Sequence, residues 1–116
     1  AVCTITRIRT GTLLDQGDVT QSLFKEITRE IVAVANAKSI DLELEECMNF
    51  LNELSLQVKG HYPSMTQDLM KGRKTEIEFI NGGVVREGKK QGIATPVNET
   101  LCRLITILHN TYDEQF

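Results

Sequence analysis

Apolar residues recur every three or four positions along most of the chain, which is the spacing of one face of an α-helix. The first such stripe follows Asp18, a good N-cap residue, and predicts a helix that runs to about Lys38. Its apolar positions are Val19, Leu23, Ile27, Ile31 and Val34. We expect the charged residues of the opposite face, Glu30 among them, to be solvated.

Two further stripes predict two more helices. One is capped by Asp41, stops at Gly60 and carries Leu44, Cys47, Leu51, Leu54 and Val58. Only a few residues separate it from the first helix, so the two should pack antiparallel. The other begins at Thr95-Pro96, an N-cap followed by proline at the first helical position. Its apolar face is Val97, Leu101, Leu104, Ile105, Leu108 and Tyr112.

The start of the chain and the segment after Pro63 are harder to interpret from pattern. Residues 1–11 alternate apolar and polar, which fits either a strand or the tail of a helix, and residues 11–17 have the composition of a loop. Residues 64–67 match a capping box and predict a short helix that Gly72 interrupts.

Residues 76–88 allow two structures. Residues 75–78 form a second capping-box pattern, followed by Ile77, Ile80 and Val84 at helical spacing. The same segment also fits a β-hairpin with Asn81-Gly82 in a type I′ turn. Because the neighbouring segments are helical, we favour a helix that ends at Gly92, with Gly82-Gly83 admitting close approach of a neighbour. The pattern as a whole predicts one all-α domain of about five helices over residues 1–116.

Composition narrows the class of protein. The chain has 116 residues, 41% hydrophobic and 25% charged, as in an ordinary globular domain. A net charge of −3 gives no global attraction to nucleic acid or to anionic membranes. No apolar run approaches the roughly 20 residues of a membrane span. The chain lacks an initiator methionine and starts within a patterned segment, so we expect it to be part of a longer protein.

Reactive side chains give no metal or phosphate site. Cys3, Cys47 and Cys102 are widely spaced, which favours semi-buried thiols in a reducing compartment over disulfides or zinc. His61 and His109 lie far apart, and no HExxH or GxGxxG pattern is present. We therefore predict no metal site.

Ser64 and Glu76 are the candidate ligand-binding residues. Both are predicted at helix N-termini, where free backbone N–H groups favour anions. From spacing alone, capping of their own helices is the favoured role for both. The alternative is that Ser64 binds a ligand carboxylate and that Glu76 accepts a hydrogen bond from a substrate hydroxyl.

Residues 64–101 carry an unusual series of motifs: Ser-Met-x-Gln-Asp, then Thr-Glu-Ile-Glu, Asn-Gly, and finally Gly-Ile-x-x-Pro-x-Asn. This series resembles the C-terminal domain of the 2-dehydropantoate 2-reductase (ketopantoate reductase) family, and the two preceding helices agree in length and order. The resemblance implies an all-helical fold of the 6-phosphogluconate dehydrogenase C-terminal type. It also implies an N-terminal Rossmann domain, absent from this chain, that binds NADPH.

By the same resemblance, the parent protein is a cytoplasmic NADP-dependent oxidoreductase. It would reduce 2-dehydropantoate, a small 2-oxo acid, to (R)-pantoate in pantothenate and coenzyme A biosynthesis. Ser64 matches the serine that contacts the substrate carboxylate, and Glu76 the glutamate that binds substrate hydroxyls. His61 stands near the substrate by position, and Asn98 belongs to the closing motif and is read as structural.

The family's catalytic lysine would lie upstream of Ala1, so no catalytic residue is expected within this chain, which should be inactive alone. An Asn-Pro pair of the family is replaced by Thr4-Ile5, which puts the identity of the substrate in doubt. Two alternatives stay open. One is a related reductase of another 2-oxo acid, and the other is a non-enzymatic helical interaction or dimerisation domain. A homodimer would be compatible with either.

Overall fold

The computed structural model describes all 116 residues as seven α-helices and one short 3₁₀-helix, with no strand. The four longer helices are α3 (Asp18–Ala37), α4 (Leu44–Gln57), α6 (Asn81–Gln91) and α7 (Pro96–Asn110). The short ones are α1 (Val2–Thr6), α2 (Thr10–Leu14), α5 (Ser64–Met70) and η1 (Tyr112–Glu114). The predicted all-α class is confirmed, with two more α-helices than the five or so expected.

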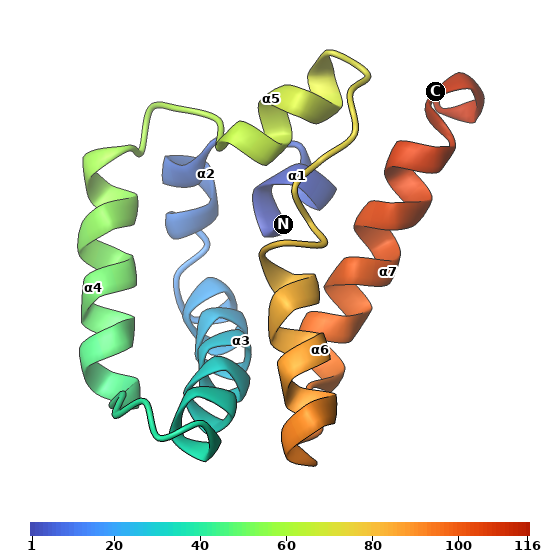
Figure 1. Ribbon diagram of the computed structural model, residues 1–116. Coiled ribbons are helices and arrows are strands. Elements are labelled where there is room, and N and C mark those ends of the chain that lie inside the picture. The colour runs from blue at the N-terminus through green and yellow to red at the C-terminus, as the bar shows by residue number, and fades with distance from the viewer.

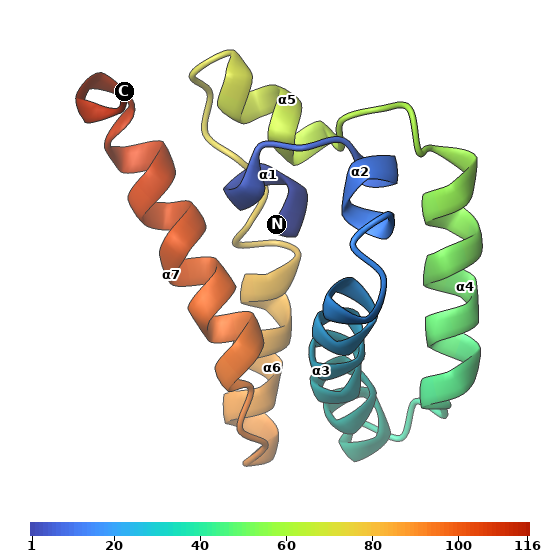
Figure 2. The same ribbon diagram turned by 180° about the vertical axis from the view of Figure 1, so that it is seen from behind.

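The longer helices stand side by side, while α1, α2 and α5 gather at one end of the molecule (Figure 1). Helix α3 lies at the centre and contacts α4, α6 and α7. The reverse view shows the same arrangement, with the C-terminus beyond the end of α7 and the N-terminus between α2 and α6 (Figure 2). The predicted antiparallel pair of α3 and α4 is present.

The buried face of α3 differs from the predicted stripe. Val19 is 76% exposed, whereas the buried residues are Thr20, Phe24, Thr28 and Val34. Because α3 is covered on several sides by different helices, its buried surface is broader than one stripe and includes threonines. Helix α4 begins at Leu44, so the predicted cap at Asp41 is wrong, whereas Thr95 with Pro96 at the first position of α7 is confirmed.

Two apolar clusters form the core. Cys3, Leu13, Phe24 and Met48 make the first, to which α1, α2, α3 and α4 contribute one residue each. Met65, Ile77 and Ile105 make the second, where α5, the segment before α6 and α7 meet. Helix α1 joins them, because Cys3 belongs to the first cluster and Ile5 packs against the second. This short helix therefore links the two apolar clusters of the core.

The start of the chain is helical, so the strand alternative for residues 1–11 is wrong, and so is the predicted loop over residues 11–17, part of which is α2. Gly11 has a packing role. Its N–H donates to the Lys59 carbonyl at 2.7 Å, and a Cβ at Gly11 would lie 2.7 Å from that oxygen. The absence of a side chain lets α2 dock against the end of α4.

Residues 76–88 form neither a hairpin nor one continuous helix. Residues 76–80 are a turn, and α6 begins only at Asn81, so the predicted helix start at Thr75 is wrong. The Thr75 hydroxyl accepts the Ile77 N–H at 3.4 Å, and the Gly82 N–H donates to the Ile77 carbonyl at 2.8 Å. Burial of Ile77, 1% exposed, holds the turn against the core. The predicted helix end at Gly92 is confirmed.

Candidate functional site

Ser64 is the first residue of α5 and is exposed. Its side chain makes no capping hydrogen bond, so the capping role that spacing favoured is wrong. The partner position of the predicted box, Gln67, donates instead to the Tyr62 carbonyl at 2.9 Å. The Ser64 hydroxyl is therefore available to a ligand.

Glu76 is exposed and lies in the turn before α6, so its predicted place in the first turn of a helix is wrong. Its backbone carbonyl accepts the N–H groups of Phe79 at 2.9 Å and Ile80 at 3.2 Å. Its carboxylate takes part in none of the ion pairs of the chain. The side chain is thus free, while the backbone beneath it is fixed.

His61 lies in the connection between α4 and α5, and its side chain is exposed. The structure uses its backbone. The His61 carbonyl accepts the Thr10 N–H at 3.3 Å and the Thr10 hydroxyl at 3.4 Å. No contact ties the imidazole to Ser64 or Glu76, so the structure gives the predicted substrate contact of His61 no support of its own.

A cavity of about 430 Å³ opens between α1, α3, α4 and the start of α6. Its lining is mostly apolar and includes Ala1, Leu54, Val58, Pro63 and Ile80. Pro63 immediately precedes Ser64, and Ile80 donates its N–H to the Glu76 carbonyl. Ser64 and Glu76 therefore each adjoin a residue that lines this cavity. A second cavity, about 510 Å³, touches neither residue.

Asn81, which follows the turn that carries Glu76, belongs to a polar network of two buried amides and the half-buried Glu30 carboxylate. The Glu30 carboxylate accepts the N–H groups of Val97 and Asn98 at the start of α7, both at 2.9 Å, and the Asn98 side-chain N–H at 2.8 Å. Asn98 is 0% exposed and accepts the side-chain N–H of Asn81 at 2.9 Å. The structural role read for Asn98 is confirmed, and Glu30 is half-buried and hydrogen-bonded where a solvated side chain was expected.

The Thr4-Ile5 pair, which departs from the family pattern, is part of the packing. Thr4 is 0% exposed, and its hydroxyl is 2.9 Å from that of Thr66, which is also buried. Ile5 packs against the second apolar cluster. The departure therefore joins α1 to α5 and lies inside the fold rather than at the surface.

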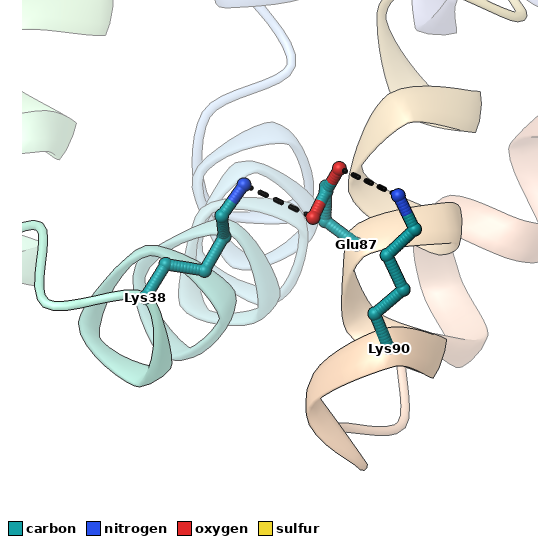
Figure 3. Close-up of polar contacts among 3 residues, drawn as sticks. All are labelled: Lys38, Glu87 and Lys90. Carbon is teal, nitrogen blue, oxygen red and sulfur yellow. Dashed lines mark hydrogen bonds and ion pairs between the residues drawn. The ribbon is translucent and has the colours of Figure 1, made fainter.

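Few groups outside this region have a shifted pKa. On the surface, Glu87 pairs with Lys38 at 3.0 Å and Lys90 at 3.5 Å (Figure 3). The hydrogen bond from Lys38 lowers the pKa of Glu87. Burial raises the pKa of the Cys3 thiol and that of the Cys102 thiol, and all three cysteines are free. None of the helices combines the length and the apolar composition of a membrane span.

Comparison with known proteins decides the family. The family described as "Ketopantoate reductase PanE/ApbA C terminal" matches residues 1–109. The chain belongs to this family. The resemblance carried by residues 64–101 is thus confirmed, and the helical fold found here is the C-terminal domain of ketopantoate reductase-like proteins.

Curated ketopantoate reductase relatives are named 2-dehydropantoate 2-reductase. The protein from Streptococcus pyogenes serotype M1 is 45% identical over 87 residues, which are 74% of this chain and 27% of the relative. That from Vibrio cholerae is 38% identical over 88 residues, 76% of this chain and 30% of the relative. The chain spans less than a third of the length of the relatives that it matches.

Solved structures share the fold. D-mandelate dehydrogenase with NADH and anilino(oxo)acetate superposes with a TM-score of 0.90 at 32% identity, covering 98% of this chain and 63% of that one. A putative 2-dehydropantoate 2-reductase from Enterococcus faecalis gives 0.87 at 33% identity, covering 98% of this chain and 37% of that one. Ketopantoate reductase-like domains thus occur in enzymes named for different substrates.

Proposed function

We propose that this domain is the substrate-binding half of an NAD(P)H-dependent reductase that converts 2-dehydropantoate to (R)-pantoate in pantothenate and coenzyme A biosynthesis. The observation that carries the proposal is the family match over residues 1–109, joined to the names of the relatives. An N-terminal Rossmann domain would complete the enzyme, which we expect to be cytoplasmic. The isolated domain would be inactive, because the proton-donating lysine of the family would lie upstream of Ala1.

The two free side chains suit a 2-oxo acid that also carries a hydroxyl. The Ser64 hydroxyl can donate a hydrogen bond to the substrate carboxylate, and the Glu76 carboxylate can accept one from the substrate hydroxyl. Both residues are exposed in this domain, so a second domain would have to cover them to exclude water. Their role is to bind and orient the substrate.

The residues of this chain do not fit a dinucleotide site. They include no strand and no glycine-rich loop of the GxGxxG type, which hold the pyrophosphate in Rossmann domains. The cofactor would therefore be bound mainly by the N-terminal domain. NADPH is the cofactor that the family resemblance implies, whereas the D-mandelate dehydrogenase structures hold NADH.

The test uses the full-length parent protein with 2-dehydropantoate as substrate. The rates of NADPH oxidation and of NADH oxidation are each measured by the loss of cofactor absorbance. We expect turnover, and we expect Glu76→Ala to lower kcat/KM by about 30- to 1000-fold, equivalent to roughly 2–4 kcal/mol. Glu78→Ala, an exposed acid two residues away, is the matched control and should leave kcat/KM within about twofold. An unchanged kcat/KM for Glu76→Ala would remove Glu76 from the site.

A second candidate is reduction of a 2-oxo acid with an apolar side chain. It is favoured by the mostly apolar lining of the 430 Å³ cavity and by the likeness to D-mandelate dehydrogenase. The replacement of the family's Asn-Pro pair by Thr4-Ile5 is a weaker argument for this candidate, because Thr4 is buried in the core. A higher kcat/KM for phenylglyoxylate than for 2-dehydropantoate would select this candidate. The absence of turnover with both substrates would favour a non-enzymatic interaction or dimerisation domain.

A further inference from the structure

The turn that carries Glu76 is short, irregular and tied down at both ends. Ile77 anchors its beginning in the core and is 1% exposed beside Met65 and Ile105. Within the turn, the Glu76 carbonyl accepts the Ile80 N–H, and the Ile77 carbonyl accepts the Gly82 N–H. These bonds are internal to residues 76–82 and fix the shape of the segment. The position of the segment in the fold therefore depends on Ile77 at its beginning and on the contacts of Asn81 at its end.

Asn81 is held from inside the protein. Its side chain, 7% exposed, donates to the Asn98 side-chain oxygen at 2.9 Å. Asn98 in turn donates one side-chain N–H to Glu30 at 2.8 Å and the other to the Ile27 carbonyl at 3.3 Å. Because a carboxylate and a backbone carbonyl can only accept, the Asn98 amide must turn its nitrogen toward α3. Its oxygen then faces Asn81, which can bond to it only as a donor.

Two acceptors on α3, the Glu30 carboxylate and the Ile27 carbonyl, therefore set the orientation of two successive amides that lead to the Glu76 turn, and Glu30 makes the shorter bond. We propose that Glu30 is a positioning residue for substrate binding, which acts through Asn98 and Asn81 on the turn that carries Glu76. The proposal rests on the proposed function, because it needs Glu76 to contact the substrate. Glu30 itself is half-buried and has no hydrogen bond to Ser64 or Glu76.

If Glu30 served only as a cap for α7, its loss would affect different measured quantities. If Glu30 only capped α7 through the N–H groups of Val97 and Asn98, its loss would lower stability and leave the affinity for the 2-oxo acid unchanged. If it positions Glu76, its loss should raise KM for the 2-oxo acid and leave KM for the dinucleotide unchanged. The two roles are separable by kinetics below the unfolding temperature.

The experiment uses the full-length parent enzyme with the substitutions Glu30→Gln and Asn81→Ala. Asn81→Ala keeps the cap on α7 and cuts only the link to the turn, so it serves where Glu30→Gln folds poorly. For each, we expect KM for the 2-oxo acid to rise about tenfold, with KM for NADPH within about twofold. Glu87→Gln, an acid on the same α3–α6 boundary but at the surface, should change neither.

A double-mutant cycle gives the decisive comparison. In a Glu76→Ala background, Glu30→Gln should raise KM by less than about twofold, because the group that it positions is already gone. A full tenfold rise in that background would overturn the proposal, as would an unchanged KM for folded Glu30→Gln or Asn81→Ala with Glu76 intact.

Hydrogen exchange separates failure of this proposal from failure of the proposed function. The backbone N–H groups of Ile80 and Gly82 should exchange faster in Glu30→Gln than in the parent, whether or not the parent reduces any 2-oxo acid. If the parent is inactive but these N–H groups exchange faster in Glu30→Gln, the proposed function is refuted. The claim that Glu30 holds the turn in position is then still supported. Unchanged exchange at both residues in a folded variant would refute the link itself.

Discussion

Helices α3 and α6 are joined by polar groups at two places that differ mainly in their access to water. At one, Glu30 on α3 connects through the fully buried Asn98 to Asn81 at the start of α6. At the other, Lys38 at the end of α3 pairs with Glu87 of α6, with 37% and 34% of their side chains exposed (Figure 3). Their key distances are nearly equal, 2.8 Å and 3.0 Å.

Equal geometry does not give equal energy in these two places. Water can replace either partner of the surface pair at little cost, and dissolved salt screens it. Within the Asn98 network, a lost partner leaves polar groups that water cannot easily reach, and that penalty is large. The comparison therefore predicts that the buried network carries the stability and the position of the turn, while the surface pair adds little.

Replacing Asn98 should have the largest effect. Asn98→Leu keeps a side chain branched at Cγ but removes the partner of Asn81 and two further hydrogen bonds, one to Glu30 and one to the Ile27 carbonyl. We expect a loss of about 3 kcal/mol or more in the free energy of unfolding, measured by urea denaturation. Asn49→Leu, on the exposed face of α4, is the control and should stay within about 0.5 kcal/mol of the parent.

Glu30→Gln should come next, with a loss of about 1–3 kcal/mol in the free energy of unfolding. The amide has one acceptor oxygen, whereas the two carboxylate oxygens of Glu30 accept the backbone N–H groups of Val97 and Asn98 and a side-chain N–H of Asn98. The same denaturation measurement applies. Glu26→Gln lies one turn earlier on α3 and is exposed, so it controls for the change of charge. Equal losses for the two variants would contradict the distinction between the half-buried, hydrogen-bonded acid and the exposed one.

Gly88→Ala tests the closeness of α3 and α6 between the two polar contacts. A Cβ at Gly88 would lie 2.9 Å from the Ile93 carbonyl oxygen and from Thr95 Cγ2, and 3.4 Å from Val34 Cγ2. We expect destabilisation of about 1–2 kcal/mol despite the better helix propensity of alanine. Gly83→Ala, where only an Arg86 side-chain nitrogen comes within 4.0 Å, should be neutral or stabilising. A melting temperature raised by both substitutions would show that the gap at Gly88 is not needed.

Glu87→Gln should have the smallest effect, and one that depends on pH. The Lys38 hydrogen bond lowers the pKa of Glu87 below its ordinary value of 4.5, so the stabilisation is present above that value and is lost as pH falls through the lowered pKa. Melting temperatures of parent and variant should therefore differ slightly near neutral pH and coincide in acid. High salt should also remove the difference. A difference that grows in acid would contradict the assigned cause.

Much of the fold was predictable from local pattern. The helices over residues 18–37 and 96–110 were expected within a residue or two, because their apolar spacing, the Thr95-Pro96 start and their length agree. The start of α6 was not, since residues 75–78 satisfy the local rules for a helix start. There, burial of Ile77 and the bond from the Gly82 N–H to its carbonyl outweigh local preference.

The candidate site was predictable only in part. Ser64 and Glu76 were identified by resemblance to the family, and the structure shows both side chains free of internal partners. Glu30 was placed on the solvated face of its helix, because nothing within α3 reveals a partner 68 residues away. The one sequence signal for this network was the closing Gly-Ile-x-x-Pro-x-Asn motif, which indicated a structural role for Asn98.

The sequence by itself determined the helical class, the antiparallel pairing of α3 and α4, and membership of the ketopantoate reductase family. These follow from periodicity and from motif residues, which are properties of neighbouring positions. Tertiary structure decided which polar residues are buried, where α6 starts and that Thr4 lies in the core. Those outcomes depend on contacts between residues far apart in the chain, and burial there raises the energy of each unpaired polar group enough to override local preference.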